Sequence, residues 1–225
     1  MRQTLMARLT IDKAAALHEW FGEHFLADRR RKSLACTDFT IISNNCWGGH
    51  VYRHYGLPYA SPTVGLYFFA EEYIRLLSDL RKHLFSPLRV IKANESRYAA
   101  YLHSKKQDEV PIGVLGDEVE IVFLHYKTAE EVIEKWNRRL SRVNMNKIYV
   151  KFSEQNLCEK RHIDAFHAMA FPHKVLLLSE PYANAPEGIV VERYAEPGNV
   201  INDARYYADF FDLTDWLNGK EFELL

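Results

Sequence analysis

Cysteines are few in this sequence, and long hydrophobic runs are absent. The three cysteines, Cys36, Cys46 and Cys158, include no CxxC pair, which argues against a disulfide framework and favours a reducing compartment. No stretch approaches the roughly 20 apolar residues that a membrane-spanning helix needs. Charged side chains between Asp12 and Glu19 interrupt the region where a signal peptide would have its apolar centre. We therefore expect a cytoplasmic protein without a transmembrane segment.

An excess of charge is also lacking, because 29 basic residues face 30 acidic ones and the formal net charge is -1. No overall electrostatic field would then draw the protein to nucleic acid, and no nucleic-acid recognition motif is present. One local basic run, residues 29–32, follows an expected N-terminal helix. This run is either a solvated helix end that complements the helix dipole or a contact with anionic lipid or a phosphorylated ligand.

Hydrophobic residues make up 48% of the 225 residues, enough for one packed domain. Apolar spacing predicts helices over 11–27, 70–85, 128–143, 159–170 and 211–217, and strands over 39–42, 88–91, 112–114, 120–124, 147–152, 174–178 and 189–191. The alternation of strands and helices indicates a Rossmann-like α/β fold, a three-layer α/β/α sandwich. Its sheet would be mainly parallel, and the pair around Gly116–Asp117 could add an antiparallel section. We expect residues 1–37 to form a helical extension packed on a single domain, 38–225.

The segment from Ser43 to Gly49, SNNCWGG, directly follows the first expected strand. In a parallel sheet, ligands bind beyond the carboxyl ends of strands. Asparagine caps helices, serine offers a hydroxyl, and glycine lets a ligand approach the main chain. The segment is therefore either a ligand-binding loop or an ordinary strand-to-helix turn. It matches neither the dinucleotide fingerprint nor the P-loop, so no nucleotide cofactor is predicted.

Cys46 is a candidate nucleophile, because a helix N-terminus lowers the pKa of a thiol. His50, His54 or His125 would have to serve as its base. Cys46, His50 and His54 are also spaced for one helical face, but Gly48 and Gly49 weaken a helix there and no acidic partner is near, so no metal site is predicted. The alternative for Cys46 is an inert buried side chain.

Three later segments carry further candidates. Residues 56–65 are rich in proline and glycine and form either a pocket wall or a plain loop. Asp117 sits at an expected turn and His125 at an expected strand end, where each is either an acid–base group or a structural residue. Arg138 and Arg139 lie away from the apolar stripe of the 128–143 helix, where they either bind a diphosphate or remain solvated.

The motifs SNNC with Gly48–Gly49, Tyr52, and GLPYASPT at 56–63 resemble an uncharacterised bacterial family commonly labelled exopolysaccharide-biosynthesis proteins. This is a domain of unknown function that often accompanies glycosyltransferases and capsule genes. Residues 111–113, Asp117 and the segment 123–126 fit the resemblance as well. It implies an α/β fold and a role in surface-polysaccharide assembly. It implies no reaction and no catalytic residue.

We expect, first, a transferase that acts on an activated sugar or polysaccharide precursor. A non-catalytic protein that binds glycan or a partner enzyme of polysaccharide assembly is the main alternative, and a Cys46-dependent acyl transferase or hydrolase is the second. The predicted catalytic candidates are Cys46, Asp117 and His125. The predicted ligand-binding residues are polar, glycine, tyrosine and arginine residues from four segments: Ser43, Asn44, Asn45, Gly48, Gly49, Tyr52, Ser61, Thr63, Tyr126, Arg138 and Arg139. The expected ligand is a sugar or nucleotide sugar, with no metal and no cofactor.

Overall fold

A computed structural model describes residues 26–221 of the chain. Four parallel strands form the main sheet in the spatial order β1-β5-β6-β7. Their bounds are β1 (Thr40–Ser43), β5 (Ile148–Ser153), β6 (Lys174–Leu178) and β7 (Ile189–Val190). Register pairs Ile42 with Val150 between β1 and β5 and Phe152 with Leu176 between β5 and β6. The strand order rises steadily across the sheet, so it lacks the order reversal of a Rossmann fold.

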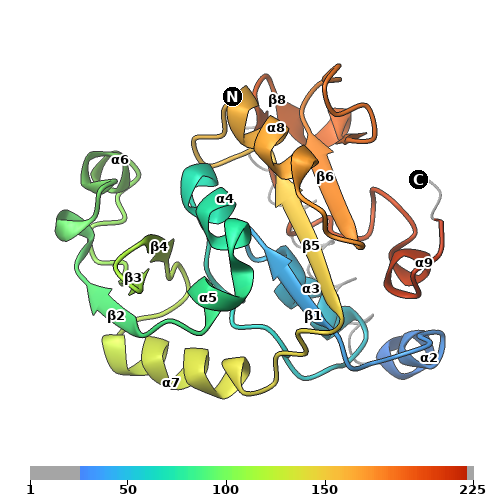
Figure 1. Ribbon diagram of the computed structural model, residues 1–225, viewed down its shortest axis with the longest axis horizontal. Helices are drawn as coiled ribbons and strands as arrows, with labels where there is room; N and C mark the ends of the chain where they lie inside the picture. Colours follow the sequence, from blue (N-terminus) through green and yellow to red (C-terminus); the bar gives the residue numbers. More distant parts are fainter. Residues whose placement is uncertain (1–25, 222–225) are drawn as a thin grey trace, which may run out of the picture.

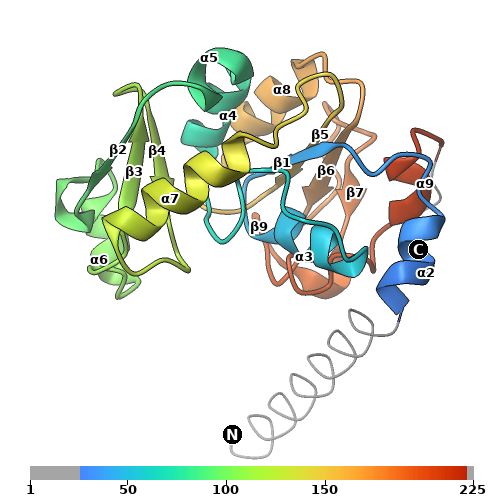
Figure 2. The ribbon, with the colours of Figure 1, turned by 90° about the horizontal axis from the view of Figure 1, so that it is seen from below.

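Helices cover both faces of this sheet, as Figure 2 shows. On one face lie α4 (Ala70–Ser78) and α8 (Lys160–Ala168), whose apolar residues pack with Val150 and Phe152. The opposite face carries α3 (Trp47–His54) and α9 (Leu213–Leu217), which pack with Tyr149 and Val175. Successive residues of a strand point to opposite faces, so β5 supplies both layers of core. The expected α/β fold is confirmed.

A second sheet, separate from the first, stands beside it (Figure 1). It is antiparallel in the order β2-β3-β4, with β2 (Leu88–Ile91), β3 (Ile112–Leu115) and β4 (Val119–Val122). Ile121 and Phe123 join the same hydrophobic cluster as Phe152, so the core runs through both sheets. The remaining elements are α2 (Ala27–Lys32), α5 (Leu80–Leu84), η2 (Ala93–Glu95), α6 (Ala99–Ser104), α7 (Ala129–Leu140), η3 (Glu192–Tyr194), β8 (Ala195–Glu196) and β9 (Asn199–Val200).

Most expected elements occur within a few residues of their predicted bounds. The single helix expected over 70–85 is wrong, because Asp79 separates α4 from α5 and its carboxylate accepts a hydrogen bond from the Lys82 backbone N–H. The expected helix over 11–27 falls mostly outside the described residues. None of the helices described is long and apolar enough to cross a membrane.

Helix α3 is not among the helices predicted from apolar spacing, because two glycines weaken a helix, although a strand-to-helix turn at Cys46 was one of the two alternatives. Packing explains them: a Cβ on Gly48 would lie 3.0 Å from Ile41 Cγ2, and one on Gly49 would lie 2.9 Å from Val64 Cγ1. Glycine at both positions lets α3 pack closely against β1 and the loop before residue 65. The helix starts directly after β1 and carries Cys46 at its N-terminal cap position.

Candidate functional site at the carboxyl end of the parallel sheet

The chain leaves the neighbouring strands β1 and β5 toward opposite faces of the sheet, into α3 and α8. Polar side chains fill the space where these two connections diverge. Ligands of parallel α/β proteins bind at such places, beyond the carboxyl ends of the strands. Here the residues are Ser43, Asn44, Asn45, Ser153 and Glu154, all of them buried.

Asn44 joins the ends of the two strands. Its Nδ2 donates to the carbonyl of Ser153 at 2.9 Å, and its Oδ1 accepts from the Ser153 N–H at 3.0 Å. The side-chain amide thus extends the parallel ladder by one rung. Asn44 therefore has a structural role, with both its amide nitrogen and its amide oxygen bonded to Ser153.

Asn45 belongs to a buried charged network with Lys151, Ser153 and Asp203, which we name the Lys151 cluster. Lys151 Nζ donates to an Asp203 carboxylate oxygen and, at 3.2 Å, to Asn45 Oδ1. Asn45 Nδ2 lies 2.8 and 2.9 Å from the two oxygens of Asp203, and Ser153 Oγ donates to Asp203 at 2.6 Å. Asn45 Oδ1 also accepts from the Trp47 N–H at 3.1 Å, so the same amide helps to start α3.

Both charges of this cluster are withdrawn from water, since Lys151 is 0% and Asp203 2% exposed. Burial lowers the pKa of Lys151, against the attraction of Asp203. Burial alone would raise the pKa of Asp203, but the Lys151 charge and hydrogen bonds from Lys151, Ser153 and Asn45 hold it below its ordinary value. The Asp203 carboxylate is thus held in its charged form by three donors, in the geometry of an ion pair with Lys151. A buried charged group next to a strand end is typical of functional sites.

Asp203 comes from an irregular segment, residues 198–207, which crosses the carboxyl edge of the sheet. The Gly198 N–H donates to Ser179 Oγ at 3.0 Å and the Val200 N–H donates to the Glu154 carbonyl at 2.6 Å. Farther along, Tyr207 Oη lies 2.9 Å from His54 Nδ1 on α3. The segment thus covers the ends of β5 and β6 and places its carboxylate over Lys151.

Cys46 lies beside the Lys151 cluster and is half-buried. Its Sγ contacts the carbonyl of Leu66 at 3.6 Å. Burial, followed by repulsion from Asp203, raises the pKa of Cys46 to about 11. The expectation that the helix N-terminus lowers this pKa is wrong, because lost hydration outweighs the short helix dipole. At neutral pH the thiol is protonated and weakly nucleophilic.

Asp117 and His125 lie at opposite ends of β4, so they do not form one site. Asp117 is in the turn between β3 and β4, its side chain 82% exposed and paired with Arg89 at 2.8 Å. It borders a cavity of about 350 Å³ over the antiparallel sheet. No residue of the Lys151 cluster lines this cavity. His125 is exposed, and its backbone N–H donates to the Gly65 carbonyl at 3.1 Å. His125 therefore lies next to the 61–65 loop and Asp117 does not.

Residues 61–65 lie against the SNNC segment, as the transferase hypothesis requires, but most of their polar atoms are buried and paired. Ser61 Oγ and Thr63 Oγ1 lie 2.9 Å apart, and Thr63 Oγ1 also donates to the Ile41 carbonyl. Ser43 Oγ donates to the Asn45 carbonyl at 2.8 Å. Tyr52 on α3 is fully buried and donates to the Phe39 carbonyl. These side chains hold the loops around the site in place.

Arg138 and Arg139 of α7 differ although they are adjacent. Arg139 is 7% exposed, donates to the Val64 carbonyl at 2.9 Å and to Tyr126 Oη, and lies 5.0 Å from the centre of the Tyr59 ring. Arg138 is exposed and pairs with Glu134. The two do not form a joint clamp.

The outer side of α3 offers polar groups next to the cluster. Cys46, His50 and Arg53 are spaced to share this side, and each is partly exposed. Arg53 donates to His50 Nδ1 at 2.8 Å and reaches Tyr59 Oη at 3.5 Å, while Tyr207 packs on His50 with ring centres 5.7 Å apart. We name Cys46, His50, Arg53, Tyr59 and Tyr207 together the α3 surface. Among residues 26–221, no group of three or more metal-ligand side chains could hold an ion.

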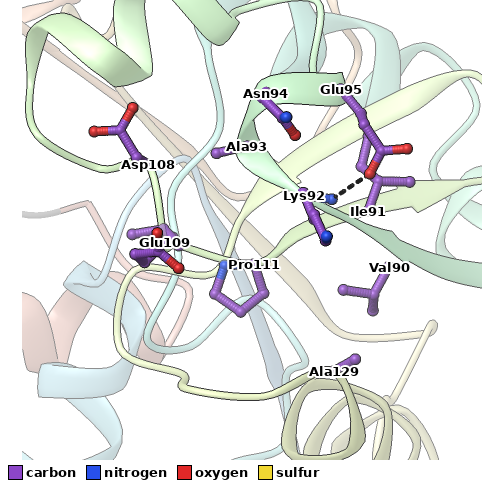
Figure 3. A pocket seen from close by; sticks show the side chains of 11 residues that line it. Val90, Ile91, Lys92, Ala93, Asn94, Glu95, Asp108, Glu109, Pro111 and Ala129 are labelled. Carbon is purple, nitrogen blue, oxygen red and sulfur yellow. Dashed lines mark hydrogen bonds between the residues drawn. The ribbon is translucent and has the colours of Figure 1, made fainter.

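A cavity of about 720 Å³ lies elsewhere, between η2, the loop before Pro111 and the start of α7 (Figure 3). In Figure 3, Glu95 lies on one side of the cavity and Asp108 and Glu109 lie on the other, while Ala129 of α7 lines its lower edge in this view. None of the predicted site residues borders it.

Sequence reasoning missed Lys151, Ser153 and Asp203. One signal was present: Lys151 interrupts the strand sequence IYVKFS between two core residues. A lysine in the middle of a central strand must be buried and so must be paired. Asp203 gave no signal, because nothing local indicates that its loop returns to the sheet.

The model of one family, described as "Domain of unknown function (DUF1919)", matches residues 18–218. The chain belongs to this family. A relative described as "Uncharacterized protein" from Haemophilus influenzae (strain ATCC 51907 / DSM 11121 / KW20 / Rd) is 26% identical over 202 residues, covering 86% of this chain and 91% of the relative. The family match spans both sheets, the Lys151 cluster and α9. It agrees with the resemblance to an uncharacterised family, and neither description names a reaction.

Proposed function

We propose that this protein binds an activated sugar at the carboxyl end of its parallel sheet and transfers it during the assembly of a surface polysaccharide. The observation that carries the proposal is the Lys151 cluster, a buried ion pair at the ends of two parallel strands. Replacing a buried ion pair by apolar residues is often neutral or stabilising. A role in function therefore explains its place better than stability does.

The α3 surface supports a sugar phosphate as the ligand class. Arg53 and His50 are hydrogen-bond donors suited to phosphate. The hydroxyl of Tyr59 lies 3.5 Å from Arg53, and the Tyr207 ring packs on His50. Aromatic faces with a polar tip suit sugar rings, which have one apolar face. The assignment to polysaccharide assembly comes from the family resemblance in the SNNC and SPT motifs.

In such a transfer, the acceptor hydroxyl oxygen bonds to the anomeric carbon of the sugar as the bond to the phosphate oxygen breaks. The acceptor proton passes to a base, and the diphosphate leaves as an anion. His125, exposed beside Gly65, is the proposed base. The positive charge of Arg53 on α3 would stabilise the leaving diphosphate. Asp117 has no part in this scheme, since it lies at the other end of β4.

Binding is tested by thermal unfolding of the full chain with a set of nucleotide sugars. We expect at least one to raise the unfolding temperature in a saturable way, and Arg53→Ala to weaken its binding at least tenfold. Arg161→Ala is the matched control, because Arg161 is an exposed arginine on α8, across the sheet from α3. No shift with any nucleotide sugar, or an equal loss in both variants, would refute the proposal.

Transfer is tested separately, by mass spectrometry of acceptor glycans incubated with the bound nucleotide sugar. Product formation that survives Cys46→Ala and is lost in His125→Ala is the expected result. Binding without product would identify the alternative role, a non-catalytic accessory protein. Loss of product in Cys46→Ala with unchanged binding would favour the Cys46-dependent alternative.

A further inference from the structure

Three side chains of the Lys151 cluster direct hydrogen-bond donors at one point. Lys151 supplies an ammonium, Asn45 an amide N–H₂ and Ser153 a hydroxyl, and all three donate to the carboxylate of Asp203. Such a combination of one cation with neutral donors is what proteins use to bind phosphate and carboxylate oxygens. The carboxylate of Asp203 thus stands in for one anionic group with two acceptor oxygens.

The donors and the acceptor come from structurally different parts of the chain. Lys151 and Ser153 lie on one face of β5, and Asn45 lies at the start of α3, held by its bond to the Trp47 N–H. Asp203 lies in the 198–207 segment, whose only regular structure is the two-residue strand β9 and in which Asn202 has a φ of +56°. Two donors are therefore fixed by the sheet and the third by the start of α3, whereas the acceptor is carried by a loop.

We propose that Asn45, Lys151 and Ser153 form a binding site for a phosphate group, and that Asp203 occupies this site until a phosphorylated ligand displaces it. This inference rests on the proposed function, because the phosphate would belong to the activated sugar or its product. On displacement, residues 198–203 move off the carboxyl edge and their bonds to Glu154 and Ser179 break, whereas Tyr207 stays on α3 beside His50 and His54. The chain's own carboxylate then acts as an internal competitor of the ligand.

An internal competitor lowers the apparent affinity, since only molecules with the site vacant can bind. Asp203→Asn keeps the shape of the side chain and removes its charge, so it weakens the competitor without removing the donors. We expect inorganic pyrophosphate to bind Asp203→Asn at least tenfold more tightly than the wild type. Lys151→Met added to Asp203→Asn removes the cation and should abolish that gain.

The experiment is a titration with pyrophosphate at constant ionic strength, in which isothermal titration calorimetry measures the binding affinity. Asp209→Asn is the matched control: it removes the same charge from the same region, but Asp209 is exposed and bonds to Tyr194 Oη. Its affinity for pyrophosphate should equal that of the wild type. The inference is overturned if Asp203→Asn binds no more tightly than Asp209→Asn, or if the gain persists without Lys151.

A second measurement serves if Asp203→Asn does not fold. Hydrogen exchange of the wild type, with and without saturating pyrophosphate, should show faster exchange of the amides in 198–203 when the anion is bound. Unchanged or slower exchange in this segment would also overturn the inference.

The two proposals fail in different ways. If pyrophosphate behaves as expected but no nucleotide sugar binds, the phosphate site stands and the sugar-transfer function falls. If nucleotide sugars bind equally well to wild type and Asp203→Asn, the function stands and Asp203 is a structural partner of Lys151.

Discussion

Asn44 and Ser153 are joined by two hydrogen bonds, through which a side-chain amide pairs with the backbone of the adjacent strand at 2.9 and 3.0 Å. This pairing fixes the separation of β1 and β5 at the edge where the Lys151 cluster lies. Two members of the cluster depend on this pairing. Asn45 is the next residue after Asn44, and Ser153 is the residue with which Asn44 pairs. The geometry of the candidate site thus depends on a residue that does not face it.

Asn44→Ala should destabilise the protein by about 2–4 kcal/mol, because it leaves the buried N–H and C=O of Ser153 without partners. Urea unfolding measures the change. Asn184→Ala is the control, since Asn184 is an exposed asparagine that bonds to the nearby side chains of Asp164 and Tyr182. Similar losses in both variants would contradict the role assigned to Asn44.

His54 should make stability fall in mild acid. Burial, followed by repulsion from Arg30, lowers the pKa of His54 from 6.5 to about 4. Between these values the unfolded chain binds the proton and the folded chain does not, so stability is complete above pH 6.5 and is lost as pH falls toward 4. The two pKa values imply a loss of about 3 kcal/mol.

Urea unfolding between pH 7 and pH 4, on wild type and His54→Gln, measures this effect. Glutamine keeps a polar group opposite Tyr207 but does not titrate, so the slope of stability against pH should be smaller in the variant. Parallel curves for the two proteins would show that His54 is not the group responsible.

Cys46 should react slowly with alkylating reagents at pH 7.5 and faster as pH rises, because its pKa of about 11 leaves little thiolate. Asp203→Asn should accelerate the reaction, since it removes the repelling charge. Mass spectrometry of the modified peptides separates Cys46 from Cys36 and Cys158. Rapid modification of Cys46 in the wild type at neutral pH would revive the Cys46-dependent hypothesis.

Gly49→Ala should destabilise the protein by about 1–3 kcal/mol, because the new Cβ would lie 2.9 Å from Val64 Cγ1. Val64→Ala removes that methyl group, so the double variant should be more stable than the sum of the single losses predicts. A double-mutant cycle by thermal unfolding measures the coupling. Strict additivity would mean that Gly49 has another role than close packing.

Local sequence determined most of the elements. Within the helix predicted over 128–143, Thr128 caps α7 by accepting a hydrogen bond from the Glu131 N–H, and the Glu131 carboxylate accepts one from the Lys127 N–H. Strand β2 has the predicted bounds, 88–91, because Pro87 ends the preceding helical region. These features depend on residues a few positions apart, which is why pattern and propensity suffice to place them.

The same reasoning correctly placed the SNNC segment at the carboxyl end of the parallel sheet. It did not predict which group each side chain of the segment contacts. Asn44 and Ser43 are bonded to backbone, whereas Asn45 faces a charged partner. Residue type cannot separate these outcomes, because serine and asparagine serve equally well as ligand-binding and as backbone-binding groups. Only the neighbouring strand decides which.

The sequence by itself determined the α/β class, the strand that leads into the site and most of the helices other than α3, because these follow from periodicity over short stretches. Tertiary structure alone decided that Lys151 meets Asp203, 52 positions along the chain, that Asp117 and His125 are apart, and that the thiol of Cys46 is protonated. These outcomes depend on burial and on which distant residues folding brings together. The residues next to each group in the sequence encode neither.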